Sequence, residues 1–186
     1  PSLSAGWRLS EESFMKGIGT ITDLKLRASW GLTGNEAVGG DYEHIALLDP
    51  TNYVLGGQLA PGQAPANFPN TGLSWEDSET FDVGLDFGLF DNRITGSFDY
   101  YTKRNTNLLL EIPVPASTGF TTAYTNIGEV LNKGWEVELN TRNLTGQLQW
   151  HTSINFSHNT NEVVNLGPDN APILGGAWDI NHNILM

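Results

Sequence analysis

The chain has 186 residues and a net charge of −12, and its 21 Asp and Glu against 9 Lys and Arg argue against a nucleic-acid partner, which needs a basic surface. It contains no cysteine, which excludes disulfides and thiolate metal sites but does not set the compartment. No stretch approaches the roughly 18 consecutive apolar residues of a transmembrane helix. The mean hydropathy of −0.26 would suit a soluble protein, but a β-barrel with a polar lumen has equally low values.

In chain order, alternation of apolar and polar residues predicts antiparallel β-strands. In one of them, Leu26, Ala28 and Trp30 share a face while Lys25 and Arg27 share the other. The connection after the opening strand, at about residues 10–23, is expected to hold one helical turn. The predicted strands cover approximately residues 3–9, 24–34, 79–90, 93–110, 128–142 and 147–158.

Two hairpins can be aligned from the sequence. With Asp91-Asn92 as a two-residue turn, Phe87 lies opposite Gly96 and Leu85 opposite Phe98, so apolar residues meet apolar or small ones. With 143–146 as a four-residue turn, apolar residues pair in the same way in the second hairpin. There Leu139 is expected to meet Trp150, Val137 to meet Thr152, and Trp135 to meet Ile154.

Short turns alternate with long irregular stretches at about 35–78, 112–127 and 159 onward, which is typical of outer-membrane barrels. The apolar face carries no charged residue in the five longer strands, so we expect it to face lipid and the opposite face to line a polar lumen. The residues expected to face lipid are Leu26, Trp30, Val83, Leu85, Phe87, Phe98, Val137, Trp150, Ile154 and Phe156. Those expected to face the lumen are Lys25, Arg27, Asp82, Asp86, Asp99, Glu136 and Glu138.

No motif for catalysis, a cofactor or a metal is present. Glu136 and Glu138 are neighbours on one strand face, whereas a glycosidase pair faces each other across the substrate. The four histidines lack ligand spacing, and the loop carboxylates lack the spacing of a calcium loop. We therefore expect no enzyme, no cofactor and no metal. The aromatic residues of the long loops are the candidates for contacts with ligand or partner: Tyr42, Tyr53, Phe68, Phe120, Tyr124 and Trp178.

Two other readings stay open on the residues alone. The main one is a soluble, secreted β-sandwich that binds carbohydrate, in which the apolar faces of two sheets would pack together. A β-rich glycoside hydrolase is the third.

Several blocks of sequence carry a resemblance. The segment 24–35, LKLRASWGLTGN, resembles a strand of the SusC/RagA family of TonB-linked outer-membrane proteins. Residues 73–76 with 81–94 and 99–103 resemble the following hairpin of that family. Residues 126–136 and 1–8 resemble two further blocks, and all four occur in the family's order and spacing.

The resemblance implies a transmembrane barrel of about 22 antiparallel strands, of which this chain would supply about six or seven. It also implies an N-terminal plug and a segment that engages TonB, neither of which is recognisable here, so we expect 1–186 to be part of a larger barrel protein. It implies a SusD-like surface lipoprotein as partner, import of glycans or peptides, and a location in the outer membrane of a Gram-negative, Bacteroidetes-type bacterium.

Overall fold

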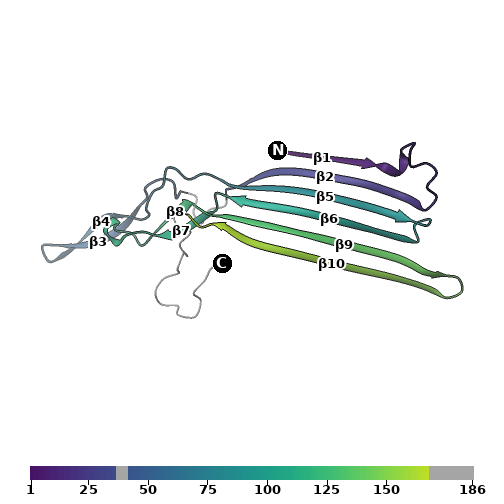
Figure 1. The fold of residues 1–186 in the computed structure, drawn as a ribbon. Coiled ribbons are helices and arrows are strands. Elements are labelled where there is room, and N and C mark those ends of the chain that lie inside the picture. The colour runs from purple at the N-terminus through teal and green to yellow at the C-terminus, as the bar shows by residue number, and fades with distance from the viewer. Residues whose placement is uncertain (37–41, 168–186) are drawn as a thin grey trace. The chain divides into compact units, whose positions relative to one another are not determined.

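A computed structural model of the chain describes residues 1–36 and 42–167. Six strands form one antiparallel sheet and lie in it in the order in which they follow one another along the chain (Figure 1). They are, in sheet order, β1 (Ser2–Arg8), β2 (Ile21–Asn35), β5 (Glu76–Leu89), β6 (Ile94–Thr106), β9 (Glu129–Thr145) and β10 (Gln149–Asn165). The six strands predicted from alternation are therefore present, with some ends displaced.

The chain divides into two compact units. The first, called the sheet unit below, comprises Pro1–Thr33, Ser78–Arg104 and Val130–Glu162. The second, called the loop unit, comprises Gly34–Asp77, Asn105–Glu129 and Val163–Met186, of which 37–41 and 168–186 lie outside the described residues.

Two small hairpins occupy stretches of the loop unit that were predicted to be irregular. One pairs β3 (Leu48–Leu55) with β4 (Gln58–Pro65), and the other pairs β7 (Leu109–Pro113) with β8 (Thr122–Asn126). The first turns at Gly56-Gly57, whose φ angles of 61° and 80° suit a hairpin turn that requires positive φ at both positions. In β3 and β4 the alternation is interrupted by prolines, which a two-stranded ribbon made only of edges tolerates. The predicted strand 93–110 is correspondingly two strands, β6 and β7.

The connection between β1 and β2 begins with a short 3₁₀ turn, η1 (Leu9–Glu11), and a second such turn, η2 (Ala116–Thr118), lies between β7 and β8. The helical turn predicted within 10–23 is therefore present as one turn of 3₁₀ helix followed by irregular turns. Trp7 at the end of β1 donates its indole N–H to Glu12 Oε1 at 2.9 Å, which fixes this connection against the strand.

The first predicted hairpin is confirmed at its turn. Asp91 and Asn92 have φ angles of 54° and 58°, and the N–H of Arg93 donates to the carbonyl oxygen of Phe90 at 3.1 Å. A Cβ atom built on Gly96 would lie 2.7 Å from Phe87 Cζ, so the ring covers the glycine as the predicted pairing requires. The positive φ of 53° at Phe90 was not predicted.

The second hairpin turns later than predicted. Strand β9 continues to Thr145, so the turn is at 146–148 rather than 143–146. Asn143 belongs to the strand, where its amide donates to Thr152 Oγ1 at 2.7 Å. Trp135 stacks on Phe156, with ring centroids 5.1 Å apart, instead of meeting Ile154. Phe156 lies two residues after Ile154, so it belongs to the same face of β10, and Trp135 keeps its predicted face.

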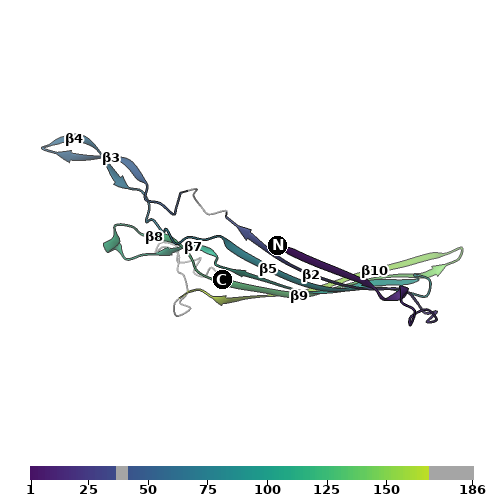
Figure 2. The same cartoon turned by 90° about the horizontal axis from the view of Figure 1, so that it is seen from above.

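The sheet unit is a single layer of strands, seen nearly edge-on in Figure 2. Among the described residues no hydrophobic side chain is fully buried. A β-sandwich buries a core between two facing sheets, so the sandwich alternative is wrong for this chain. No helix within residues 1–36 and 42–167 is long and apolar enough to cross a membrane.

Candidate functional site

An ion cluster on the polar face joins three strands of the sheet unit. Arg27 of β2 donates Nε to Asp86 Oδ2 and Nη2 to Asp86 Oδ1, both at 2.9 Å, and Nη2 also lies 2.8 Å from Asp99 Oδ1 of β6. Gly84 leaves the room for this cluster, because a Cβ there would lie 2.3 Å from Asp99 Oδ1. Three of the residues predicted for the lumen face are thereby brought together, as charge-assisted and partly bidentate hydrogen bonds.

Two other polar-face candidates lie beside one member of that cluster. Glu136 and Glu138 line a shallow hollow of about 420 Å³ together with Asp99. Glu138 also accepts a hydrogen bond of 2.7 Å from the amide of Asn140. Lys25 runs over the backbone of β1, where its Cε lies 3.4 Å from a Cβ built on Gly6.

The opposite face of the sheet unit is a broad apolar surface. In the β1–β2 pair, Leu3 is opposite Trp30, Ala5 opposite Ala28, and Trp7 opposite Leu26, so apolar residues meet across the strands. Of the residues predicted to face lipid, Leu85, Phe87 and Val137 are half-buried by their sheet neighbours. The exposed ones are Leu26, Trp30, Val83, Phe98, Trp150, Ile154 and Phe156.

This apolar surface ends in charged residues toward the loop-bearing ends of the strands. Glu79 lies within β5, two residues before Phe81, so its side chain is on the same face as that of Phe81. It accepts a hydrogen bond from the indole N–H of Trp30 at 2.8 Å. Lys133, two residues before Trp135, pairs with Glu162 at 3.9 Å. The prediction of a face without charge is therefore wrong for the full strands and holds only for their middle.

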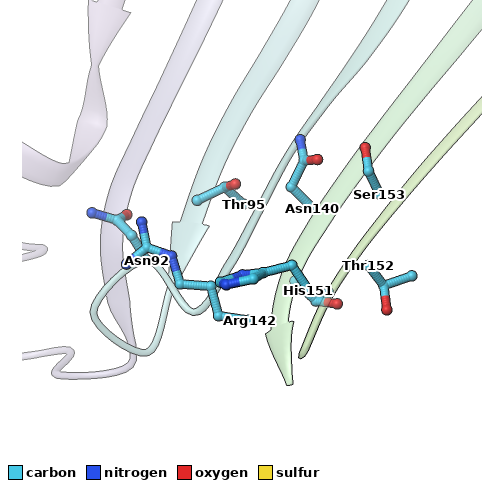
Figure 3. A pocket seen from close by; sticks show the side chains of 8 residues that line it. Asn92, Thr95, Asn140, Arg142, His151, Thr152 and Ser153 are labelled. Carbon is cyan, nitrogen blue, oxygen red and sulfur yellow. The ribbon is translucent and has the colours of Figure 1, made fainter. Parts of the chain in front are cut away.

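A second hollow lies at the opposite, short-turn end of the polar face (Figure 3). Its volume is about 320 Å³, and its lining is polar or basic, with Arg142 of β9 and His151 of β10 as its only ionisable side chains among the described residues. Sequence analysis missed it because no motif marks it. Its lining residues are Asn92, Thr95, Asn140, Thr141, Arg142, His151, Thr152 and Ser153.

The loop aromatics are only partly brought together. Phe68 and Phe120 meet edge to face with ring centroids 5.8 Å apart, and both line a cavity of about 220 Å³ with Tyr124. Tyr53 instead lies over Gly62 within the β3–β4 hairpin, where a Cβ on the glycine would be 2.7 Å from the ring. Tyr42 is exposed and lines neither the two hollows of the polar face nor this cavity. Trp178 lies outside the described residues.

Asparagine side chains hold the backbone around this cavity. The amide of Asn67 accepts from the N–H of Leu47 at 2.8 Å and donates to the carbonyl of Ile45 at 2.9 Å. Asn70 donates to the carbonyl of Tyr124 at 3.0 Å, and so links the segment after β4 to β8. These residues were not predicted as functional, and an isolated asparagine in a loop gives no signal that could have identified them.

Carboxylates complete the lining. Glu43 and Glu111 both border the cavity, together with Ala66, Asn67 and the start of β8. Within residues 1–36 and 42–167, no group of three or more His, Cys, Asp or Glu side chains is arranged to hold a metal ion.

A family model, related sequences and solved structures that match this chain all indicate one family. Residues 1–180 match the family model described as TonB dependent receptor-like, beta-barrel. The chain is 41% identical over 177 residues to TonB-dependent receptor P39 of Formosa agariphila, covering 95% of this chain and 17% of that protein. It is 37% identical to TonB-dependent receptor SusC of Bacteroides thetaiotaomicron, covering 89% of this chain and 17% of that protein.

A solved structure gives the same result. The structure of the RagAB peptide transporter aligns with a TM-score of 0.74 and 30% identity, covering 89% of this chain and 18% of that one. The chain thus spans less than a fifth of the length of these relatives.

Proposed function

Because the chain belongs to the TonB-dependent receptor-like β-barrel family, we propose that it forms part of the barrel wall of an outer-membrane transporter. One observation supports this most: the sheet unit is a single layer with an exposed apolar face, a polar opposite face and no buried core among the described residues. A barrel wall in a bilayer needs these two faces, because lipid covers one and the water-filled or plugged interior the other.

In this proposal the face of Leu85, Phe98 and Ile154 contacts lipid, and the face of Arg27, Asp86 and Glu136 lines the interior. The charged residues that end the apolar surface, Glu79 and Lys133, would mark where the strands leave the hydrocarbon on the loop side. The Trp30 indole bound to Glu79 fits that level, since tryptophan favours the membrane interface. The loop unit would then be extracellular and the short turns periplasmic.

We further propose that the parent protein imports glycans or peptides, energised through TonB, together with a SusD-like surface lipoprotein in a Bacteroidetes-type outer membrane. The support is similarity to SusC and to a transporter of peptides, each over most of this chain. The proposal gives the chain no catalytic step.

Cysteine labelling tests the topology, because this chain contains no cysteine and labelling of the unsubstituted parent protein can be subtracted. In the full-length parent protein, Asn52→Cys in the loop unit and Gly146→Cys in a short turn would each be treated in intact cells with a maleimide too large for porins. We expect Asn52→Cys to react at once and Gly146→Cys to react only after the outer membrane is permeabilised. Labelling of both in intact cells, or of Gly146→Cys alone, would contradict the proposed orientation.

Transport is tested separately. Deletion of the parent gene, or collapse of the proton gradient in cells that retain it, should abolish uptake of a labelled oligosaccharide or oligopeptide that the wild type accumulates. Uptake that survives deletion of the parent gene would refute a transport role.

A further inference from the structure

The charges of this chain are divided sharply between its two units. All nine Lys and Arg lie in residues 1–33, 78–104 and 130–162, the sheet unit. The segments 34–77, 105–129 and 163–186 contain none, and they hold ten of the 21 Asp and Glu. The loop unit therefore has an acidic field that none of its own residues neutralises, and such a field attracts cations and repels anions over about a Debye length.

The cavity lined by Phe68 and Phe120 in the loop unit combines these two aromatic rings with a lining that is otherwise mainly polar. The rings of Phe68 and Phe120 stand at 85° to each other, and Phe68 keeps 37% of its surface exposed. A cation over an aromatic face is attracted by the ring quadrupole. The volume of about 220 Å³ suits one side chain or one sugar ring rather than a whole oligomer.

Carboxylates are available at the same cavity. Glu111 accepts a hydrogen bond from the hydroxyl of Thr122 in the neighbouring strand, which orients the carboxylate across the β7–β8 pair. Glu43 is half-buried and accepts a long hydrogen bond of 3.5 Å from the amide of Asn67. Neither carboxylate forms an ion pair with any residue in the part of the chain that the structure describes.

The cavity walls are fixed before any ligand arrives. Asn67 and Asn70 hold one wall through backbone hydrogen bonds, and the antiparallel pairing of Glu111 with Tyr124 holds the other. A site whose walls are already ordered loses less entropy on binding.

We propose that this cavity binds a primary ammonium group of the imported substrate, such as a lysine side chain or the amine of an amino sugar. The rings of Phe68 and Phe120 would border the ammonium group and its attached carbons, and Glu43 and Glu111 would accept hydrogen bonds from its N–H groups. Polyanionic substrates such as sulfated or uronic glycans would be disfavoured by the acidic loop unit. This inference rests on the proposed transport function and specifies its substrate class.

The test uses the purified full-length parent protein in detergent and two matched pairs of probes. One pair is a blocked pentapeptide with a central lysine and the same peptide with acetyl-lysine. The other is a glucosamine hexamer and its N-acetylated form, so that the two pairs distinguish a peptide source from a glycan source. We expect the charged member of at least one pair to bind about tenfold more tightly, as one charge-assisted hydrogen bond allows.

The double variant Glu43→Gln/Glu111→Gln should reduce that preference to within about twofold. A circular dichroism spectrum equal to that of the wild type would show that this variant is folded. The matched control Glu36→Gln/Asp49→Asn removes the same charge from the loop unit outside the cavity and should retain the preference. An equal loss of the preference for the charged probe in the control variant would overturn the cavity as the site. So would a wild-type protein that binds both members of each pair equally.

Uptake by cells with and without the parent gene separates this inference from the transport function. Gene-dependent uptake of the neutral probes, with no preference for ammonium in the purified protein, would refute the ammonium site and leave transport standing. Preference in the purified protein with uptake that does not depend on the gene would refute transport and leave the site standing.

Discussion

Placing a charge in the middle of the apolar surface is the most direct test of which face meets lipid. Leu85 lies at the centre of the apolar row that runs from Phe81 to Leu89 on β5. We expect Leu85→Arg in the full-length parent protein to destabilise the folded barrel strongly, because lipid cannot solvate a guanidinium group.

The magnitude follows from the length of that row. Its eight residue steps span about 27 Å along the strand. With the usual strand tilt of about 40°, this covers roughly 20 Å of bilayer. Leu85 is then about 10 Å from either end, farther than an arginine side chain can reach into the headgroups, so the value near the midplane applies: about 2–4 kcal/mol.

The control is a charge of the same kind on the other face. Asp82→Arg changes the polar face of the same strand, and Asp82 forms no ion pair within the described residues. Asp86 is unsuitable, because an arginine there would replace the bidentate partner of Arg27. Urea titration of both variants folded in lipid vesicles, followed by tryptophan fluorescence, would measure the free energy of unfolding. Equal destabilisation by the two substitutions, or a larger effect of Asp82→Arg, would refute the assignment of faces.

Three further outcomes follow from individual contacts. Arg27→Met should destabilise the parent protein by about 2 kcal/mol in the same titration, because it leaves the carboxylates of Asp86 and Asp99 side by side without their cation. The partial exposure of these groups limits the effect. An unchanged free energy of unfolding would show that the cluster does not stabilise the protein. Asn126→Ala removes three side-chain hydrogen bonds of 2.7–2.9 Å that tie β8 to neighbouring loop backbone. Hydrogen exchange should rise in the loop unit and stay unchanged in β5, and a uniform rise would contradict a local role. Trp135→Leu should lower the free energy of unfolding by about 1 kcal/mol, because the stack on Phe156 is lost. Adding Phe156→Leu should not remove that stacking energy a second time, so the two effects should not be additive.

The sequence determined the strands of the sheet and the face of each side chain. Period-two alternation depends only on the geometry of an extended chain, so Leu26, Arg27 and Asp86 could be assigned to faces without knowing the partners. The turn at Asp91-Asn92 was also readable, since those residues tolerate positive φ. The family was recognisable from four short blocks in order.

Outside the first hairpin, only the tertiary structure decided which residues meet across strands. The alternation rule is unchanged by a shift of two residues, so it could not choose between Ile154 and Phe156 as the neighbour of Trp135, and a turn signal at 143–146 misplaced the hairpin. Arg27, Asp86 and Asp99 are far apart in sequence, and their cluster depends on register and on the space above Gly84. The cavity of Phe68 and Phe120 is formed by segments about fifty residues apart, joined by asparagine hydrogen bonds that follow no periodic pattern. Local geometry thus fixed the faces of the sheet, and long-range pairing fixed its sites.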